Sequence, residues 1–445
     1  MSDTPISSFL KEYQNKSAAR LHMPGHKGRG ANGESFDITE ISGADSLFEA
    51  NGIIKESEKN AGEIFGTDTF YSTEGSSLSI RAMLYLTVLY AKSTGRKPLI
   101  AAARNAHKAF VSAAALLDFD IEWIYAKDSD YLSSRFTKED IADYFERAKE
   151  LPIAVYLTSP DYLGFISDIK GISEECKKHG VLLIVDNAHG AYLKFLPTSL
   201  HPIDLGADMC CDSAHKTLNA LTGCAYLHLS KSAPTLFKSK AKDAMMLFAS
   251  TSPSYLLLNS LDLLNPYLKG DFNTKLQSFV DKLQSFKSEL DFAGYKTVGD
   301  EPMKITILAK EYGYLGGEIS DYLATQGVFV EFSDPDYLVL MPSPENSDAE
   351  LDIAKAALLS LPKKSRISDT PPKVYIPKRA CSVREAILSP SEVLPIEECI
   401  GKTVASVTAA CPPAIPIAVS GEIIDEETIT RFCYYGTEKC SVIKK

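Results

Sequence analysis

Between residues 60 and 230, the distribution of apolar and polar positions is typical of an α/β protein. Short apolar runs, typical of buried strands, are separated by longer stretches of helical composition. The candidate strands are Leu99–Ala103, Ala154–Thr158, Val181–Val185 and Ala207–Cys211, with a helix at Ser167–His179. This order predicts βαβ units that build a mostly parallel sheet.

The parts of the sequence before residue 60 and after residue 230 show other patterns. A short amphipathic helix at Ile6–Leu21 precedes a turn-rich loop, and later runs at Lys304–Leu308 and Tyr337–Met341 predict strands of a smaller α/β unit. A helix is predicted from Glu426. The predicted parts are an N-terminal arm at 1–45, a large α/β domain at 46–255, a smaller α/β domain at 256–365 and a C-terminal segment at 366–445.

Composition narrows the class of protein. With 445 residues, 45% of them hydrophobic, the chain is long enough for a large buried core. A formal charge of −11 argues against nucleic-acid binding through overall electrostatics. Nine cysteines without a Cys-x-x-Cys pair indicate free thiols rather than disulfides or a metal site. No leader or membrane span is recognisable, so we expect no membrane partner and a cytoplasmic location.

Lys216 is the most informative candidate residue. Three His-Lys dipeptides occur, and the one ending at Lys216 is the best candidate, because it follows a predicted strand, comes 30 positions after Asp186 and has Ser213 and Thr217 beside it. A pyridoxal phosphate site needs a lysine for the aldehyde, a carboxylate for the pyridine nitrogen and small donors for the phosphate. Lys216 fits the first need, although a surface lysine is the ordinary alternative.

Asp186 ends a predicted buried strand and would pair with the pyridine nitrogen. Ligands in open α/β sheets bind at the carboxyl ends of strands, where Asp186 and Thr158 both lie. A helix-capping or turn carboxylate is the alternative. The neighbouring Ala188 and His189, together with Lys216, favour the cofactor role.

Further candidates for the cofactor have weaker signals. Gly75, Ser76 and Ser77 precede a helical run, so their amides and hydroxyls could bind a phosphate, or the serines could simply cap the helix. His107 follows a predicted strand and could lie on the face of the pyridine ring. A histidine satisfied within the core or a loop is the alternative for His107.

At these residues the chain resembles the bacterial ornithine/lysine/arginine decarboxylases, pyridoxal 5'-phosphate enzymes of the aspartate aminotransferase fold (fold type I). The resemblance covers nearly the whole chain. It is to the shorter form of the family, which lacks an N-terminal wing domain. The matching stretches are Met23–Gly28, Asp37–Glu40, Gly43–Asp45, Arg104–Lys108, Asp186–Ala191 and Ser213–Leu218.

The resemblance implies a fold type I large domain with a smaller C-terminal α/β domain, and a homodimer. It implies that Lys216 binds the aldehyde, that Asp186 faces the pyridine nitrogen and that His107 stacks on the ring. Ser76, Ser77, Ser213 and His215 would lie near the phosphate. His215 is also, beside Lys216, a candidate acid for protonating the substrate carbon.

Several positions depart from the family pattern. Asn187 stands where glutamate is usual, and Asp161 and Ala214 stand where threonine is usual. Ala414 replaces a glycine, and Ser420 a proline, near the predicted loop at Cys411–Pro416. These changes leave the identity of the substrate open.

The reaction expected from the resemblance is decarboxylation of arginine, lysine or ornithine. A basic substrate needs a carboxylate for its distal cation, and the candidates are Asp45, Glu49 and Glu422. Transamination is the main alternative, and it would need an arginine for the α-carboxylate. The arginines after residue 260 are Arg366, Arg379, Arg384 and Arg431. A cofactor-binding protein with lapsed activity is the third possibility.

Overall fold

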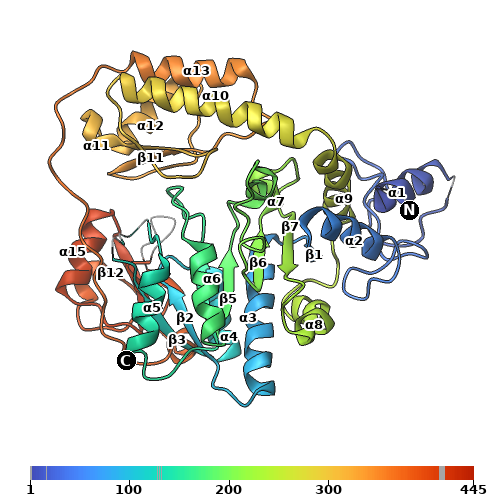
Figure 1. Cartoon of the computed structure of the whole chain (residues 1–445), viewed down its shortest axis with the longest axis horizontal. Helices are drawn as coiled ribbons and strands as arrows, with labels where there is room; N and C mark the ends of the chain where they lie inside the picture. Colours follow the sequence, from blue (N-terminus) through green and yellow to red (C-terminus); the bar gives the residue numbers. More distant parts are fainter. Residues whose placement is uncertain are drawn as a thin grey trace. The chain divides into compact units, whose positions relative to one another are not determined.

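The chain folds into two compact units in a computed structural model (Figure 1). The structure describes residues 3–16, 18–127, 129, 131, 133–409 and 416–444. The first unit comprises Met1–Leu99, Glu150–Tyr156 and Ile169–Thr274, and the second comprises Ile100–Lys149, Leu157–Asp168 and Lys275–Lys445. The four-part division of the sequence into arm, two domains and C-terminal segment stays a prediction.

Helices and strands alternate along most of the chain. The helices are α1 (Pro5–Asn15), α2 (Ile53–Phe65), α3 (Gly75–Ser93), α4 (Lys108–Leu117), α5 (Lys138–Arg147), α6 (Ile169–Lys178), α7 (Ala214–Thr217), α8 (Thr235–Met246), α9 (Tyr255–Lys269), α10 (Phe272–Phe292), α11 (Ala309–Tyr312), α12 (Gly316–Thr325), α13 (Asp348–Ser360), α14 (Val383–Leu388) and α15 (Glu426–Tyr434). The strands are β1 (Asp68–Ser72), β2 (Leu99–Ala103), β3 (Asp120–Ile124), β4 (Ala154–Thr158), β5 (Leu182–Asp186), β6 (Met209–Asp212), β7 (Ala225–Leu229), β8 (Thr297–Val298), β9 (Ile305–Leu308), β10 (Phe332–Ser333), β11 (Tyr337–Leu340), β12 (Ser391–Pro395), β13 (Thr408–Ala409), β14 (Ala418–Val419) and β15 (Lys439–Ile443).

The largest sheet has seven strands in the order β1-β7-β6-β5-β4-β2-β3. β5 and β6 are parallel, whereas β7 runs antiparallel to β6 and to β1. Every residue of β5, β6 and β7 is buried, which agrees with their continuous apolar runs. Because β5 and β6 are parallel, the residues that follow them emerge at the same edge of the sheet.

The helices of the first unit pack on this sheet and on one another. α3 contacts β1, β6 and β7 and also α8, and α1 contacts α2 and α9 (Figure 1). The prediction that the first helix reaches Leu21 is wrong, because α1 ends at Asn15 and Lys16 is extended. Ile6 and Leu10 are buried on the apolar face of α1, whereas Ala18 and Leu21 beyond its end are exposed.

The second unit contains a four-stranded antiparallel sheet in the order β10-β11-β9-β8. One face of this sheet packs on the loop after β4, where Leu163 contacts Tyr337 and Val339. The C-terminal segment forms a core around Ile424, Phe432 and Val442, which Tyr131 joins, beside the antiparallel pair β12 and β15. The predicted loop at Cys411–Pro416, with Ala414, falls almost entirely outside the described residues.

Most predicted strands and helices are present, with small shifts at their ends. β2 and β4 have the predicted bounds, and β5 and β6 each begin and end one or two residues later than predicted. The helix predicted from Glu426 is α15, and no helix or strand lies between α13 and residue 378. The sequence pattern therefore locates the strand ends that carry the candidate chemistry.

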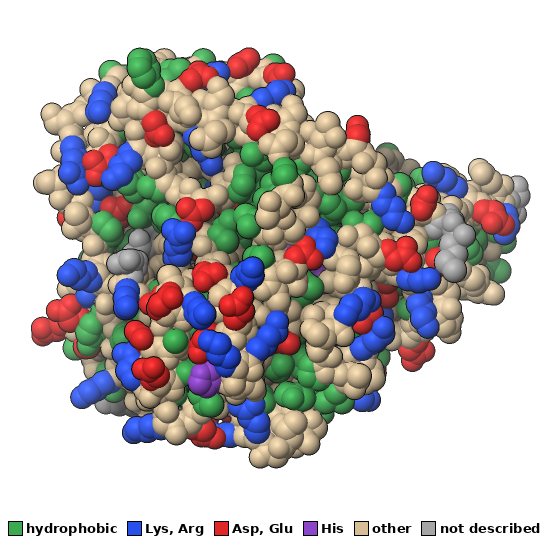
Figure 2. All heavy atoms as spheres, viewed as in Figure 1, with side chains coloured by type: hydrophobic (Ala, Val, Ile, Leu, Met, Phe, Trp, Pro, Cys, Tyr) green, Lys and Arg blue, Asp and Glu red, His purple; other side chains and the backbone are tan. Residues whose placement is uncertain are grey.

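The described residues leave eight cysteines unpaired, and six of these are buried. Lys and Arg side chains lie among Asp and Glu side chains on the face shown in Figure 2, so the coloured residues there form no continuous basic stripe. Among the described helices, none has both the length and the apolar character needed to cross a bilayer.

Candidate cofactor site

Lys216 lies just beyond the carboxyl end of β6, in the short helix α7. Its main-chain N–H donates to the carbonyl of Ser213 at 3.1 Å. The preceding residue, His215, places Nδ1 2.9 Å from the carbonyl oxygen of Cys224. The Lys216 Nζ lies 2.9 Å from Nε2 of His189, which follows β5. Two predicted residues from neighbouring parallel strands are thus in direct contact.

Asp186 is the last residue of β5 and is buried, and its carboxylate accepts hydrogen bonds from neutral donors. The Tyr156 hydroxyl donates to Oδ2 at 3.2 Å, and the Cys211 thiol approaches Oδ1 at 3.5 Å. The N–H of Ala188 donates to Oδ1 at 3.2 Å. Burial, reinforced by the Asp186 charge, raises the pKa values of Tyr156 and Cys211 well above their usual values, so both stay protonated donors. A protonated ring nitrogen would complete this set as a countercharge.

The candidate phosphate donors also meet in the first unit. The Ser213 hydroxyl donates to the Ser76 hydroxyl at 2.9 Å, which joins the end of β6 to the N-terminus of α3. Gly75 has φ +69° and donates its N–H to the carbonyl of Gly223 at 2.8 Å, and Ser77 follows in the first turn. The side chain of the N-cap residue Glu74 makes no capping bond there. A 19-residue helix directs its positive end at these hydroxyls, which suits an anion.

Thr217 adds a second fitting observation. Its hydroxyl is buried and has no hydrogen-bond partner among the described residues. Together with the amine, the carboxylate and the two serines, this donor set matches what pyridoxal phosphate requires of a protein. The residues present in the first unit therefore fit the predicted cofactor.

His107 and Thr158 lie in the second unit. His107 is the N-cap residue of α4, where its Nδ1 accepts the N–H of Ala109 at 3.2 Å. The Thr158 hydroxyl donates to the carbonyl of Asn105 at 3.2 Å, just after β2. Both residues stand at the strand ends that the sequence predicted. Their approach to Lys216 and Asp186 stays a prediction.

The sequence did not point to a buried polar network beside Asp186. Asp212, the last residue of β6, accepts a hydrogen bond from the Asn187 amide at 2.7 Å and lies 3.0 Å from Nε2 of His201 and 3.2 Å from Nε2 of His228. The donor atoms of His201, Cys210 and Asp212 lie within 4.8 Å of one another. Burial raises the pKa of the Cys210 thiol well above its usual value, and Asp212 is already bonded, so we assign no metal to this group.

Two of the three carboxylates predicted for the distal cation already have structural partners. Glu422 accepts two hydrogen bonds from Arg104, both at 2.7 Å, and the pair is buried. Asp45 accepts the N–H groups of Asn51, Gly52 and Ile54 at 2.8–3.0 Å at the start of α2. These bonds argue against a distal-cation role for Glu422 and Asp45, and leave the exposed Glu49.

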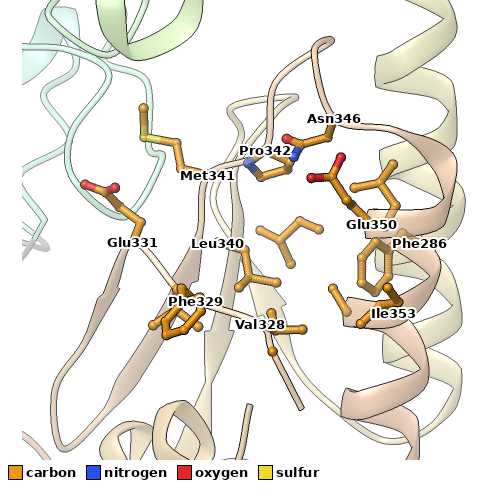
Figure 3. Close-up of a pocket in the computed structure, with 15 residues that line it drawn as sticks. Phe286, Val328, Phe329, Glu331, Leu340, Met341, Pro342, Asn346, Glu350 and Ile353 are labelled. Carbon is orange, nitrogen blue, oxygen red and sulfur yellow. The ribbon is translucent and has the colours of Figure 1, made fainter. Parts of the chain in front are cut away.

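A cavity of about 410 Å³ lies in the second unit, between the four-stranded sheet and helices α10 and α13 (Figure 3). Its lining is mainly apolar and includes Phe286, Val328, Leu340 and Ile353. Glu350 at its rim is committed to the N-terminus of α13, where it accepts the N–H of Ser347 at 2.7 Å. The lining contains none of the predicted cofactor residues.

Comparison with known proteins identifies relatives over nearly the whole chain. A family model described as the major domain of Orn/Lys/Arg decarboxylases matches residues 4–298. Arginine decarboxylases of Halalkalibacterium halodurans and Bacillus subtilis are each 29% identical, over 96% of this chain and 92% of their own length. A lysine decarboxylase structure from Francisella novicida has a TM-score of 0.81 at 17% identity, covering 99% of this chain and 81% of its own. The predicted fold type I class is confirmed.

Proposed function

The chain belongs to the Orn/Lys/Arg decarboxylase family, and from this premise we propose that it converts a basic amino acid to the corresponding amine and CO2. It is an amino-acid decarboxylase whose cofactor is pyridoxal phosphate. Arginine is the first candidate substrate, because the curated relatives that match over nearly their whole length include arginine decarboxylases. Lysine and ornithine are the alternatives.

The observation that carries the proposal is the meeting of Lys216 with His189 at the edge of the sheet where Asp186 ends β5. Lys216 would hold the aldehyde of the cofactor, and Asp186 would face the pyridine nitrogen. Ser76, Ser77 and Ser213 would bind the phosphate, and His107 would cover the ring. When bound, the protonated pyridine ring accepts the electron pair that remains when CO2 leaves.

The contact between Lys216 and His189 also suggests how a proton reaches the substrate carbon. The Lys216 amine and the His189 imidazole are within hydrogen-bond distance, at 2.9 Å, so a proton can pass between them. His215 is the other candidate acid, but its Nδ1 is engaged with the carbonyl of Cys224. We therefore favour Lys216 as the group that protonates the carbon, with His189 as its partner.

The arginines considered for transamination have other partners. Arg366 pairs with Glu311 at 2.9 Å, and Arg431 pairs with Glu427 at 2.6 Å. Arg384 donates to two carbonyls near the end of α4, and Arg379 donates to the carbonyl of Cys381. These bonds weigh against a substrate-carboxylate role, and therefore against transamination.

The test is to incubate the pyridoxal phosphate-loaded protein with arginine, lysine or ornithine and to follow CO2 and amine. We expect CO2 and the amine without an added keto-acid acceptor. Formation of keto acid that depends on an acceptor would instead establish transamination. The absence of both products with all three substrates would overturn the proposed reaction.

Replacing the lysine tests the site itself. Lys216→Ala should remove the visible absorbance of the lysine-bound cofactor and lower turnover by at least about 10²–10⁴-fold, the usual contribution of a positioned acid–base group. Lys108→Ala, at another His-Lys dipeptide and exposed, is the matched control and should keep the absorbance. Retention of both absorbance and turnover in Lys216→Ala would refute the assignment.

The homodimer implied by the family resemblance is part of the same proposal. Light scattering of the loaded protein measures its mass in solution. A mass of one chain at working concentration would contradict the dimer without affecting the assignment of Lys216.

A further inference from the structure

Asp212 is the centre of a fully buried polar network in the first unit. Its Oδ1 accepts the Asn187 amide at 2.7 Å, while Oδ2 lies 3.0 Å from His201 Nε2 and 3.2 Å from His228 Nε2. The far side of His228 is held by the hydroxyls of Thr67 and Thr69, at 3.2 Å and 3.0 Å from Nδ1. The network therefore extends from β1 across β7 and β6 to the turn after β5.

The two imidazoles keep Asp212 ionised. Burial alone would raise the pKa of this carboxyl, but His201 and His228 outweigh burial and hold the pKa well below its usual value. Burial also lowers the pKa of His228, despite the nearby carboxylate. Asp212 is thus an anionic acceptor for the Asn187 amide at neutral pH, and such charge-assisted bonds are stronger than neutral ones.

Asn187 connects this anion to the turn that carries two cofactor residues. Its N–H donates to the carbonyl of Cys211 at 3.0 Å, and its carbonyl accepts the N–H of Gly190 at 2.8 Å. Main chain and side chain of Asn187 are therefore both fixed to the end of β6 or to the turn. Asp186 precedes it directly, and His189 follows two residues later, so the turn that Asn187 fixes carries both of these residues.

We propose that Asp212, acting through Asn187, is a positioning residue for the cofactor site: it fixes the turn that aims the Asp186 carboxylate and the His189 imidazole. The proposal rests on the roles proposed above for Asp186 and Lys216. It goes beyond them because neither Asp212 nor Asn187 is placed in contact with cofactor or substrate. The same role explains why asparagine stands at position 187, where glutamate is usual in the family. An amide can donate to the Asp212 carboxylate, whereas an ionised carboxylate cannot.

The experiment compares two buried asparagines of the same unit. Asn187→Ala removes the link between Asp212 and the turn. Asn265→Ala is the matched control, because Asn265 is also fully buried and donates to a hydroxyl, that of Tyr71 at 3.0 Å, and to the carbonyl of Ser57 at 3.2 Å. Each variant is titrated with pyridoxal phosphate, and the pH dependence of the bound-cofactor absorbance is recorded beside thermal unfolding.

We expect Asn187→Ala to raise the apparent dissociation constant of the cofactor by about 10–100-fold, as loss of an outer partner does for bound metals. The pH midpoint of the cofactor absorbance should shift, and kcat should fall more than KM changes. Asn265→Ala should unfold earlier but bind the cofactor within about twofold of the wild type. Equal affinity loss in both variants, or none in Asn187→Ala, would overturn the proposal.

A conservative variant separates positioning from stability. Asp212→Asn keeps an oxygen that can accept the Asn187 amide and should recover most of the cofactor affinity that Asp212→Ala loses. Asn187→Ala and Asp212→Ala should not be additive, because they break one link. Wild-type protein without the lysine-bound absorbance would defeat the proposed function itself, whereas wild-type absorbance with additive losses would defeat only the positioning role.

Discussion

Two buried carboxylates of the first unit, Asp212 and Asp262, have opposite environments. Asp212 faces two imidazoles and stays ionised. Asp262, in α9, accepts the N–H of Ser7 at 2.8 Å and a hydrogen bond from the Ser57 hydroxyl, and both of these donors are neutral. Burial raises the pKa of Asp262 to about 6 despite these bonds. The partners, rather than the depth of burial, decide whether a buried carboxylate keeps its charge.

The difference matches what each carboxylate holds in place. Asp262 anchors the N-terminus of α1 to α9, a task that a neutral carboxyl performs nearly as well as an ionised one. Asp212 holds the turn beside Asp186, where a fixed negative charge strengthens each bond that it accepts. Arg104 and Glu422 in the second unit are a third case, in which the positive charge of a guanidinium compensates a buried carboxylate.

The largest effect is expected where charge compensation is complete. Arg104→Met leaves Glu422 buried without its partner, and loss of one member of a buried pair costs about 3–5 kcal/mol of unfolding free energy. Urea unfolding measures this cost. Arg135→Met, which removes an exposed pair with Asp300, is the control and should cost about 0–1 kcal/mol.

Arg104→Met together with Glu422→Leu should recover much of the loss, since no unpaired charge then remains. A cost below about 1 kcal/mol for Arg104→Met alone, within the range of surface pairs, would mean that water reaches Glu422 and that the comparison of buried charges fails there.

Asp212→Asn should cost about 2–3 kcal/mol at pH 7, because hydrogen bonds to a charged group contribute more than neutral ones. The lowered pKa of Asp212 determines how its contribution to stability changes with pH. The stability from this carboxylate is fully present above its unfolded pKa, near 3.8, and is lost only as the pH falls through the still lower folded value. Unfolding curves of wild type and variant should therefore keep a constant separation from pH 5 to pH 7. A separation that closes over this range would contradict the ionised state.

Asp262→Asn should show the opposite dependence and a smaller effect, about 1 kcal/mol or less at pH 5. The folded pKa of about 6 lies above the ordinary value of 3.8, so the stability from Asp262 is fully present below pH 3.8 and is lost as the pH rises through about 6. The wild type should thus lose stability relative to the variant between pH 4 and pH 7. An unchanged difference across that range would show that Asp262 titrates normally.

The sequence located the ends of β4, β5 and β6 to within one or two residues, because these strands are short apolar runs. It therefore located Asp186 and Lys216, whose signals are local. The partners of Asp212 could not be predicted, because His201 returns to β6 through the loop after η1 (Ala191–Phe195), and the contact with Asn187 depends on the register of β5 and β6. For the same reason the sequence could not show that Glu422, a candidate for the distal cation, is bonded to Arg104, which lies 318 positions away.

Asp186 completes the comparison, because its donors are also neutral and the ring nitrogen of the cofactor would supply the countercharge. Tyr156→Phe removes one donor, the hydroxyl 3.2 Å from Oδ2, and should cost about 0.5–1.5 kcal/mol of stability. With fewer hydrogen bonds to the carboxylate, the ring nitrogen should keep its proton to higher pH. The added positive charge on the ring should move the pH midpoint of the bound-cofactor absorbance downward. Spectra recorded against pH for Tyr156→Phe and for the control Tyr226→Phe, whose buried hydroxyl has no described partner, would show it. An equal shift in both variants would mean that ring packing, and not the bond to Asp186, sets the charge on the cofactor.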